Sequence, residues 1–190
     1  MPTLGQAVEP YKDIIERVPH VCIKVPTGGG KTFIASSALS TIFSAYDKSE
    51  YKSVVWLVPS NTILTQTLKN LKNPNHPYRQ RINSDFRNKV EVFDKAQALN
   101  GAGFSLSVAQ ENLCIFVMSF DSLRAKKKED RKVYQENGNL QSFESIVPKN
   151  ADGESDLQLM KVFQALKPVV IVDESHNAET DLSVEMLKNL

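Results

Sequence analysis

Short runs of apolar, mostly β-branched residues alternate along the chain with longer segments of mixed character. Five runs have the length and composition of β-strands: residues 20–25, 53–59, 90–94, 113–119 and 168–172. Several of them are apolar at successive positions, as strands are when helices cover both faces of a parallel sheet. The pattern therefore predicts a mainly parallel sheet.

The segments between these runs predict helices. Apolar residues recur at helical spacing over residues 31–46, 61–71 and 155–166. Strands that alternate with helices in this way are typical of an α/β fold with helices on both faces of the sheet. We therefore expect a single α/β domain over residues 1–190.

Three segments depart from this alternation. Residues 73–87 contain two prolines and several charges, and we interpret them as an irregular surface excursion. Residues 126–153 are polar and rich in turn residues, which favours a flexible insertion between two core elements. Residues 180–190 predict an amphipathic helix without a cap signal after it, so we expect the chain to be a fragment of a longer protein.

Composition restricts the class of protein without identifying a partner. Lys plus Arg number 23 against 22 Asp plus Glu, so the formal charge of +1 gives no support for a nucleic-acid partner. The two cysteines, Cys22 and Cys114, lie far apart in apolar runs, which indicates reduced, buried thiols rather than a disulfide framework or a zinc site, and a cytoplasmic location. No secretion signal is present, and no apolar run approaches the ~20 residues that span a bilayer. We expect no contact with a membrane.

The strongest motif lies between the first predicted strand and the first predicted helix. It consists of Pro26, Thr27, Gly28, Gly29, Gly30, Lys31 and Thr32. Consecutive glycines let backbone N–H groups converge on phosphate oxygens at a helix N-terminus. Lys31 would then reach the β and γ phosphates of ATP, and the Thr32 hydroxyl would bind Mg²⁺. The strict Walker A pattern has glycine where this chain has Val25.

The alternative for this motif is a glycine-rich turn that starts a helix and binds nothing. Each glycine carries a conformational-entropy cost, so three in succession weaken folding unless a ligand needs the bare backbone. The position between a strand and a helix therefore favours nucleotide binding.

A second motif follows the last predicted strand, where Asp173 and Glu174 end an apolar run. Parallel strands bring their carboxyl ends to the ligand crevice, so this pair is expected near Lys31. Asp173 would hold Mg²⁺ and Glu174 would act as the general base for the attacking water. The alternative is that the two carboxylates cap the next helix or face solvent, which the phosphate loop makes less favourable.

Together with Asp173, Glu174, Ser175 and His176, the phosphate loop resembles motifs I and II of the DEAD/DEAH-box helicases of superfamily 2, in particular the motor subunits of type III and type I restriction enzymes. Residues 56–60 and 117–123 are similar to two further segments of that family. The resemblance implies an N-terminal RecA-like P-loop NTPase domain, an ATP hydrolase of the helicase or translocase type.

The resemblance also implies roles for residues that chemistry alone does not single out. It gives His176 a role in coupling hydrolysis to movement. It places the sugar-phosphate backbone of nucleic acid, with DNA favoured, against Pro59, Ser60, Asn61, Ser119 and Phe120. A second RecA-like domain and a modification or specificity subunit are the implied partners. Since the second domain would supply an arginine finger, we expect residues 1–190 alone to hydrolyse ATP very slowly.

Two other interpretations remain open from the sequence. One is a P-loop ATPase switch or small-molecule kinase that does not act on nucleic acid, which leaves residues 59–60 and 119–120 without a task. The other concerns a run of basic residues, which could contact phosphates but is more typical of a solvated surface: Arg124, Lys126, Lys127, Lys128, Arg131 and Lys132.

Overall fold

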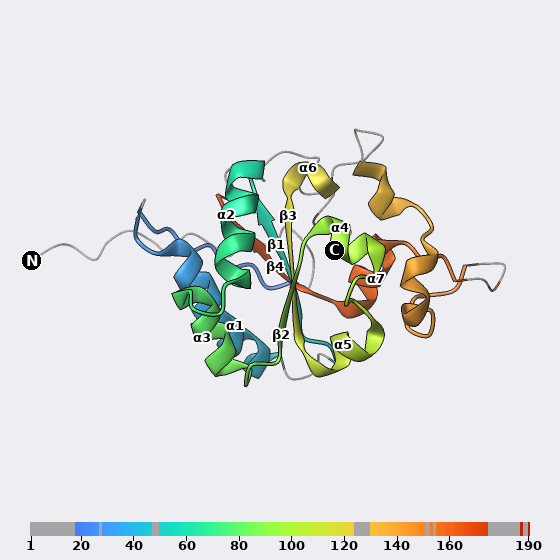
Figure 1. Cartoon of the computed structure of the whole chain (residues 1–190), viewed down its shortest axis with the longest axis horizontal. Coiled ribbons are helices and arrows are strands. Elements are labelled where there is room, and N and C mark those ends of the chain that lie inside the picture. Colours follow the sequence, from blue (N-terminus) through green and yellow to red (C-terminus); the bar gives the residue numbers. More distant parts are fainter. Residues whose placement is uncertain are drawn as a thin grey trace, which may run out of the picture.

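The sheet of the protein is parallel throughout. The computed structural model describes residues 18–26, 28–46, 50–123, 130–150, 153, 155–174, 187 and 190. Its four strands are β1 (Ser53–Val58), β2 (Val90–Phe93), β3 (Leu113–Ser119) and β4 (Val169–Val172). They lie in the order β2-β3-β1-β4 (Figure 1). The predicted α/β class is confirmed, and so are four of the five predicted strands.

The two central strands form the middle of the core. Every residue of β1 and β3 is buried, and the two strands pair in parallel with Val55 opposite Phe116 and Leu57 opposite Met118. Leu57 also lies opposite Val172 of β4. β-branched and aromatic side chains on both faces suit a sheet that is covered on both sides.

Helices cover both faces, as predicted (Figure 1). One face carries α1 (Lys31–Ala45), α2 (Asn61–Lys72) and α3 (Pro77–Asp85), which contribute Leu39, Phe43, Leu71 and Ile82 to a buried cluster. The other face carries α4 (Lys95–Asn100), α5 (Leu106–Glu111), α6 (Phe120–Leu123), two 3₁₀ helices, η1 (Asp130–Tyr134) and η2 (Gly138–Phe143), and α7 (Leu159–Leu166).

The strand predicted at residues 20–25 is wrong. These residues form no strand, and Val21 and Ile23 are 83% and 54% exposed. A strand needs a neighbour for its N–H and C=O groups. Among the described residues β4 pairs only with β1, and no strand pairing involves residues 20–25. The segment is apolar, but it is not buried.

The irregular excursion predicted at residues 73–87 is also wrong, because most of it is α3. Pro77 occupies the first helical position, where its fixed φ and missing N–H start a helix rather than break one. His76 caps the helix, since its Nδ1 accepts the N–H of Tyr78 at 3.3 Å. Arg79 connects α3 to α2 and β2, because its guanidinium donates to the carbonyls of Leu71 (3.1 Å) and Val90 (2.7 Å).

The predicted insertion, residues 126–153, contributes to the core over its described middle part. Leu140 and Phe143 of η2 are fully buried, and the Phe143 ring lies 4.5 Å from that of Phe104. The side-chain amide of Asn137 donates to the carbonyl of Leu99 at 2.6 Å. Residues 130–150 are therefore packed against the sheet and α4, and flexibility stays a prediction for the remainder. The helix predicted at residues 180–190 lies outside the described residues except for Leu187 and Leu190, which pack against the same core.

The two cysteines differ sharply in environment, and a labelling experiment should separate them. The prediction of buried thiols is confirmed for Cys114 and wrong for Cys22. Cys22 is exposed, whereas Cys114 is buried in β3, where burial raises the pKa of its thiol to about 12. Because the thiolate is the nucleophile, we expect a disulfide reagent to modify one thiol rapidly and the second only in denaturant. Cys22→Ser should remove the rapid phase, and rapid labelling of two thiols in the native protein would contradict this burial.

Candidate nucleotide site

Each of the three glycines in the phosphate loop occupies a position where a side chain would be unfavourable. Gly28 and Gly30 have φ values of 76° and 80°, in the left-handed region that side chains rarely adopt. At Gly29 a Cβ atom would lie 2.6 Å from Cγ1 of Val25 and 2.9 Å from the carbonyl oxygen of Pro26. The Gly29 N–H donates to that carbonyl and closes the turn. Thr27, between Pro26 and the glycines, lies outside the described residues.

The loop opens directly into the N-terminus of α1. Gly30 is the N-cap residue, it supplies no side-chain cap, and the first turn carries no acidic residue. The amides of Lys31, Thr32 and Phe33 precede the first intrahelical bond, which Ile34 donates to Gly30. Such amides and the helix dipole favour a bound anion. The start of this helix therefore has the chemistry of a phosphate site.

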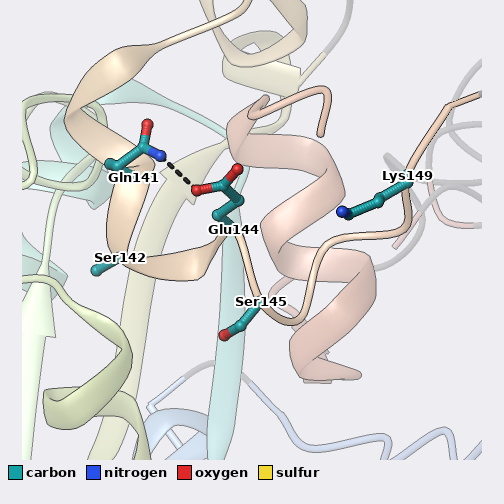
Figure 2. A pocket seen from close by; sticks show the side chains of 5 residues that line it. All are labelled: Gln141, Ser142, Glu144, Ser145 and Lys149. Atoms are coloured by element: carbon teal, nitrogen blue, oxygen red, sulfur yellow. Dashed lines mark hydrogen bonds between the residues drawn. The ribbon is translucent and has the colours of Figure 1, made fainter. Parts of the chain in front are cut away.

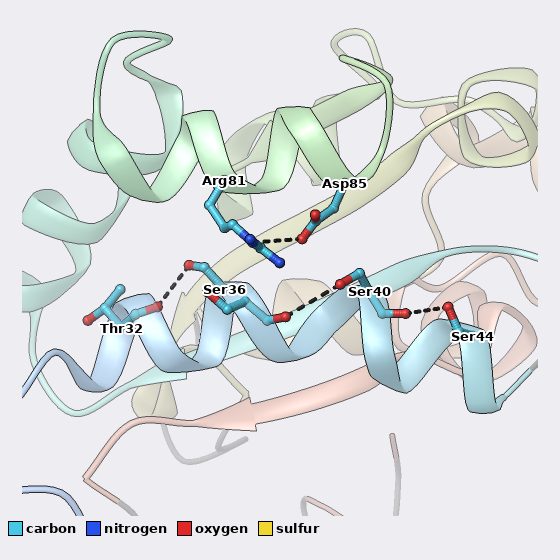
Figure 3. Close-up of polar contacts among 7 residues, drawn as sticks. Thr32, Ser36, Ser40, Ser44, Arg81 and Asp85 are labelled. Atoms are coloured by element: carbon cyan, nitrogen blue, oxygen red, sulfur yellow. Dashed lines mark hydrogen bonds and ion pairs between the residues drawn. The ribbon is translucent and has the colours of Figure 1, made fainter.

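Further along α1, serine hydroxyls donate to carbonyls of the same helix (Figure 3). Ser36 donates to the Thr32 carbonyl at 2.8 Å, and Ser44 to that of Ser40 at 2.7 Å. These hydroxyls are thus engaged within the helix.

Lys31 and Glu174 form an ion pair across the site. They are separated by 143 positions in sequence, yet the Lys31 ammonium donates to a carboxylate oxygen of Glu174. This hydrogen bond is the main reason that the pKa of Lys31 is raised. The structure thus brings together the phosphate loop and the acidic pair.

The end of β4 positions both carboxylates. The Asp173 N–H donates to the carbonyl of Leu57 at 2.9 Å, so Asp173 is held against the end of β1. Glu174 follows with a φ of 54°, a left-handed conformation that is unfavourable for a residue with a side chain. Burial raises the pKa of Asp173, and the nearby charge of Glu174 adds to this effect. The two neighbours therefore have different environments: Asp173 lies against the sheet and Glu174 pairs with Lys31.

The oxygen ligands present suit Mg²⁺ rather than a transition metal. Across the described ranges no three His, Cys, Asp or Glu side chains form a cluster that could hold a metal alone. Mg²⁺ is usually bound by one or two protein oxygens together with substrate phosphates and water. Thr32 and Asp173, at the start of α1 and the end of β4, fit that kind of site.

The residues predicted to contact nucleic acid differ in accessibility. Ser60 and Asn61 are exposed at the start of α2, where the Ser60 hydroxyl accepts the N–H of Ile63 at 3.4 Å. Pro59 is half-buried. Ser119 and Phe120 are buried, and the Ser119 hydroxyl pairs with that of Ser122 at 2.9 Å. Ser60 and Asn61 are therefore accessible to a ligand, whereas Ser119 and Phe120 are covered. His176 lies outside the described residues.

A hollow of about 390 Å³ lies elsewhere on the surface, beside η2 (Figure 2). It is lined by side chains of the polar residues Gln141, Ser142, Glu144, Ser145 and Lys149, and the Gln141 amide donates to the carboxylate of Glu144. The hollow belongs to the segment that packs on α4, on the opposite face of the sheet from α1. It is unrelated to the phosphate loop.

Comparison with known proteins identifies a family. A model of the family described as type III restriction enzyme, res subunit, matches residues 5–190. Searches of curated proteins and of solved structures give no match. The matched range contains both the phosphate loop and the acidic pair. No helix of the described residues is long and apolar enough to cross a membrane.

Proposed function

Because the chain belongs to the type III restriction enzyme res subunit family and is thus an ATP-dependent helicase-like motor domain, we propose that it hydrolyses Mg²⁺-bound ATP to move along nucleic acid. One observation supports this most: Lys31 of the phosphate loop and Glu174 of the acidic pair lie in contact. A lysine that binds phosphates and a carboxylate that activates water must be within a few ångströms of one another for γ-phosphate hydrolysis.

The proposed division of labour follows from these positions. Backbone amides of Gly28 to Thr32 hold the phosphates, and Lys31 binds the β and γ oxygens. Thr32 and Asp173 would hold Mg²⁺, which when bound neutralises charge on those oxygens. Glu174 accepts a proton from water as the water oxygen bonds to the γ phosphorus. The bond between that phosphorus and the bridging oxygen then breaks, releasing ADP and phosphate.

The ion pair implies an order of events. Without nucleotide, Glu174 neutralises the Lys31 ammonium. An arriving triphosphate offers Lys31 a more highly charged partner, so the ammonium moves to the phosphates and the carboxylate is released to the water. Binding thereby produces the free base that hydrolysis needs.

For the nucleic acid, we propose a single strand, with DNA favoured, that passes over Ser60 and Asn61. Short polar side chains and helix N-terminal amides contact phosphates without reading sequence. The proposed motor works with a second RecA-like domain and with a modification or specificity subunit of a restriction enzyme in the cytoplasm. His176 would couple hydrolysis to movement.

A pair of variants tests this path of the strand. Asn61→Ala and Ser60→Ala should each weaken binding of a labelled single strand, measured by fluorescence anisotropy, while nucleotide affinity stays unchanged. Ser60 also caps α2, so Ser105→Ala is the matched control: the Ser105 hydroxyl caps α5 by accepting the N–H of Val108 at the same 3.4 Å. Ser105→Ala should leave strand binding intact.

The opposite result would redirect the proposal. If the variants at Ser60 and Asn61 bind the strand like the parent chain, while neutralising Lys126, Lys127 and Lys128 removes binding, the basic run is the contact. If no nucleic acid binds or alters hydrolysis at low salt, the motor proposal fails and an ATPase switch accounts for the site.

A further inference from the structure

Three aromatic side chains gather beside the phosphate loop. Phe33 lies two residues after Lys31 and is 43% exposed. Its ring lies 6.3 Å from that of Tyr78, and Tyr78 lies 4.4 Å from the imidazole of His76. Covering the exposed part of such a ring with a ligand would be favourable. The proposed hydrolysis uses none of these three rings.

Packing between two helices fixes the group. α1 and α3 run side by side in the same direction, since Phe33 meets Tyr78 near their starts and Phe43 meets Phe86 (6.0 Å) near their ends. The His76 ring is held as the cap of α3 through its Nδ1 atom. The aromatic faces are therefore positioned before any ligand arrives, which reduces the ordering cost of binding.

We propose that Phe33, supported by Tyr78 and His76, is the platform on which the base of the bound ATP stacks. This inference rests on the proposed function, because it requires the phosphates on Gly28 to Thr32. The Phe33 amide is the last of the open amides at the start of α1. A triphosphate bound by these amides would place its ribose and base on the surface beside them, and the exposed ring of Phe33 belongs to the same first turn of α1.

Stacking determines the selectivity to be expected. Aromatic faces bind the π-face of any base, whereas selectivity among bases requires hydrogen bonds to their edges. ATP and GTP should therefore bind with affinities within a few fold of one another. Inorganic tripolyphosphate, which lacks a base, should bind more weakly than ATP by the contribution of the platform.

Calorimetric titrations with Mg²⁺ and either ATP or tripolyphosphate separate the platform from the phosphate loop. Phe33→Ala should weaken ATP about 5- to 100-fold, the range expected for one base stacked on an aromatic ring, and leave tripolyphosphate unchanged. Phe33→Trp should restore ATP binding, and its indole fluorescence should respond to ATP but not to tripolyphosphate. Tyr46→Ala is the matched control, because Tyr46 is 46% exposed at the other end of α1.

Each alternative result has a distinct meaning. Equal loss of both ligands in Phe33→Ala, or loss of neither, would overturn the platform. So would tripolyphosphate that binds the parent chain as tightly as ATP does. If the parent chain binds neither ligand, the proposed function fails and the platform fails with it. A Phe33→Ala variant that binds ATP normally but loses affinity for a single strand would assign the rings to nucleic-acid bases instead.

Discussion

Glu174→Gln is expected to slow ATP hydrolysis about 10²- to 10⁴-fold, the usual contribution of a general base, while ATP binds more tightly than to the parent chain. The amide cannot accept the proton from water, so the chemical step is lost. It also cannot neutralise Lys31, so the triphosphate no longer competes with a carboxylate for the ammonium. Opposite effects on rate and affinity are the signature of the proposed ion-pair exchange.

Single-turnover phosphate release gives the rate, and calorimetry with a non-hydrolysable ATP analogue gives the affinity. Glu91→Gln is the control, because Glu91 is an exposed carboxylate of β2, a strand at the opposite edge of the sheet from β4. Hydrolysis at the parent rate in Glu174→Gln would remove Glu174 from its role as base. Reduced hydrolysis with weakened ATP binding would instead contradict the ion-pair exchange.

Lys31→Ala should lower ATP affinity about 100-fold, since the variant loses charge-assisted hydrogen bonds to the β and γ phosphates, each of which is typically worth about 10-fold or more. Folding stability should barely change, because Lys31 and Glu174 are partly exposed and such ion pairs contribute little. A large loss of affinity without a loss of stability would identify Lys31 as a ligand-binding residue.

Calorimetric titration and thermal unfolding, run on the same samples, test both parts. Lys161→Ala is the matched control: Lys161 forms a comparable partly exposed ion pair with Asp156 at 3.1 Å, far along the chain from the loop. It should match Lys31→Ala in stability and the parent chain in affinity. Undiminished ATP affinity in Lys31→Ala would refute the phosphate-loop assignment.

The two motifs could be predicted from sequence because their chemistry is local. Glycines with positive φ before a Lys-Thr pair, and carboxylates at the end of an apolar strand, follow from what phosphate binding and parallel sheets require. The proximity of the acidic pair to Lys31 was expected from the shared carboxyl edge of parallel strands, although residues 20–25 before the loop form no strand and the ion pair itself, between Lys31 and Glu174, was not predicted. The left-handed backbone of Glu174, which turns this side chain to the lysine, has no signal in the residue type.

Features that depend on tertiary partners escaped prediction. Residues 20–25 have the composition of a strand, but composition does not supply a neighbouring strand. Pro77 predicts an irregular segment when it is considered alone, but at the first position of a helix it favours the helix. Phe33, His76 and Tyr78 come together only because α1 packs beside α3, and no spacing rule joins position 33 to position 78.

Arg79 has a consequence for how force could travel through the domain. Its guanidinium holds the last turn of α2 and the first residue of β2, and α2 begins at the exposed Ser60 and Asn61. A helix of 12 residues is a stiff rod about 18 Å long. A pull on a nucleic acid held at Ser60 and Asn61 would therefore be transmitted along α2 to β2, both through the buried Leu71 and through the two hydrogen bonds of Arg79.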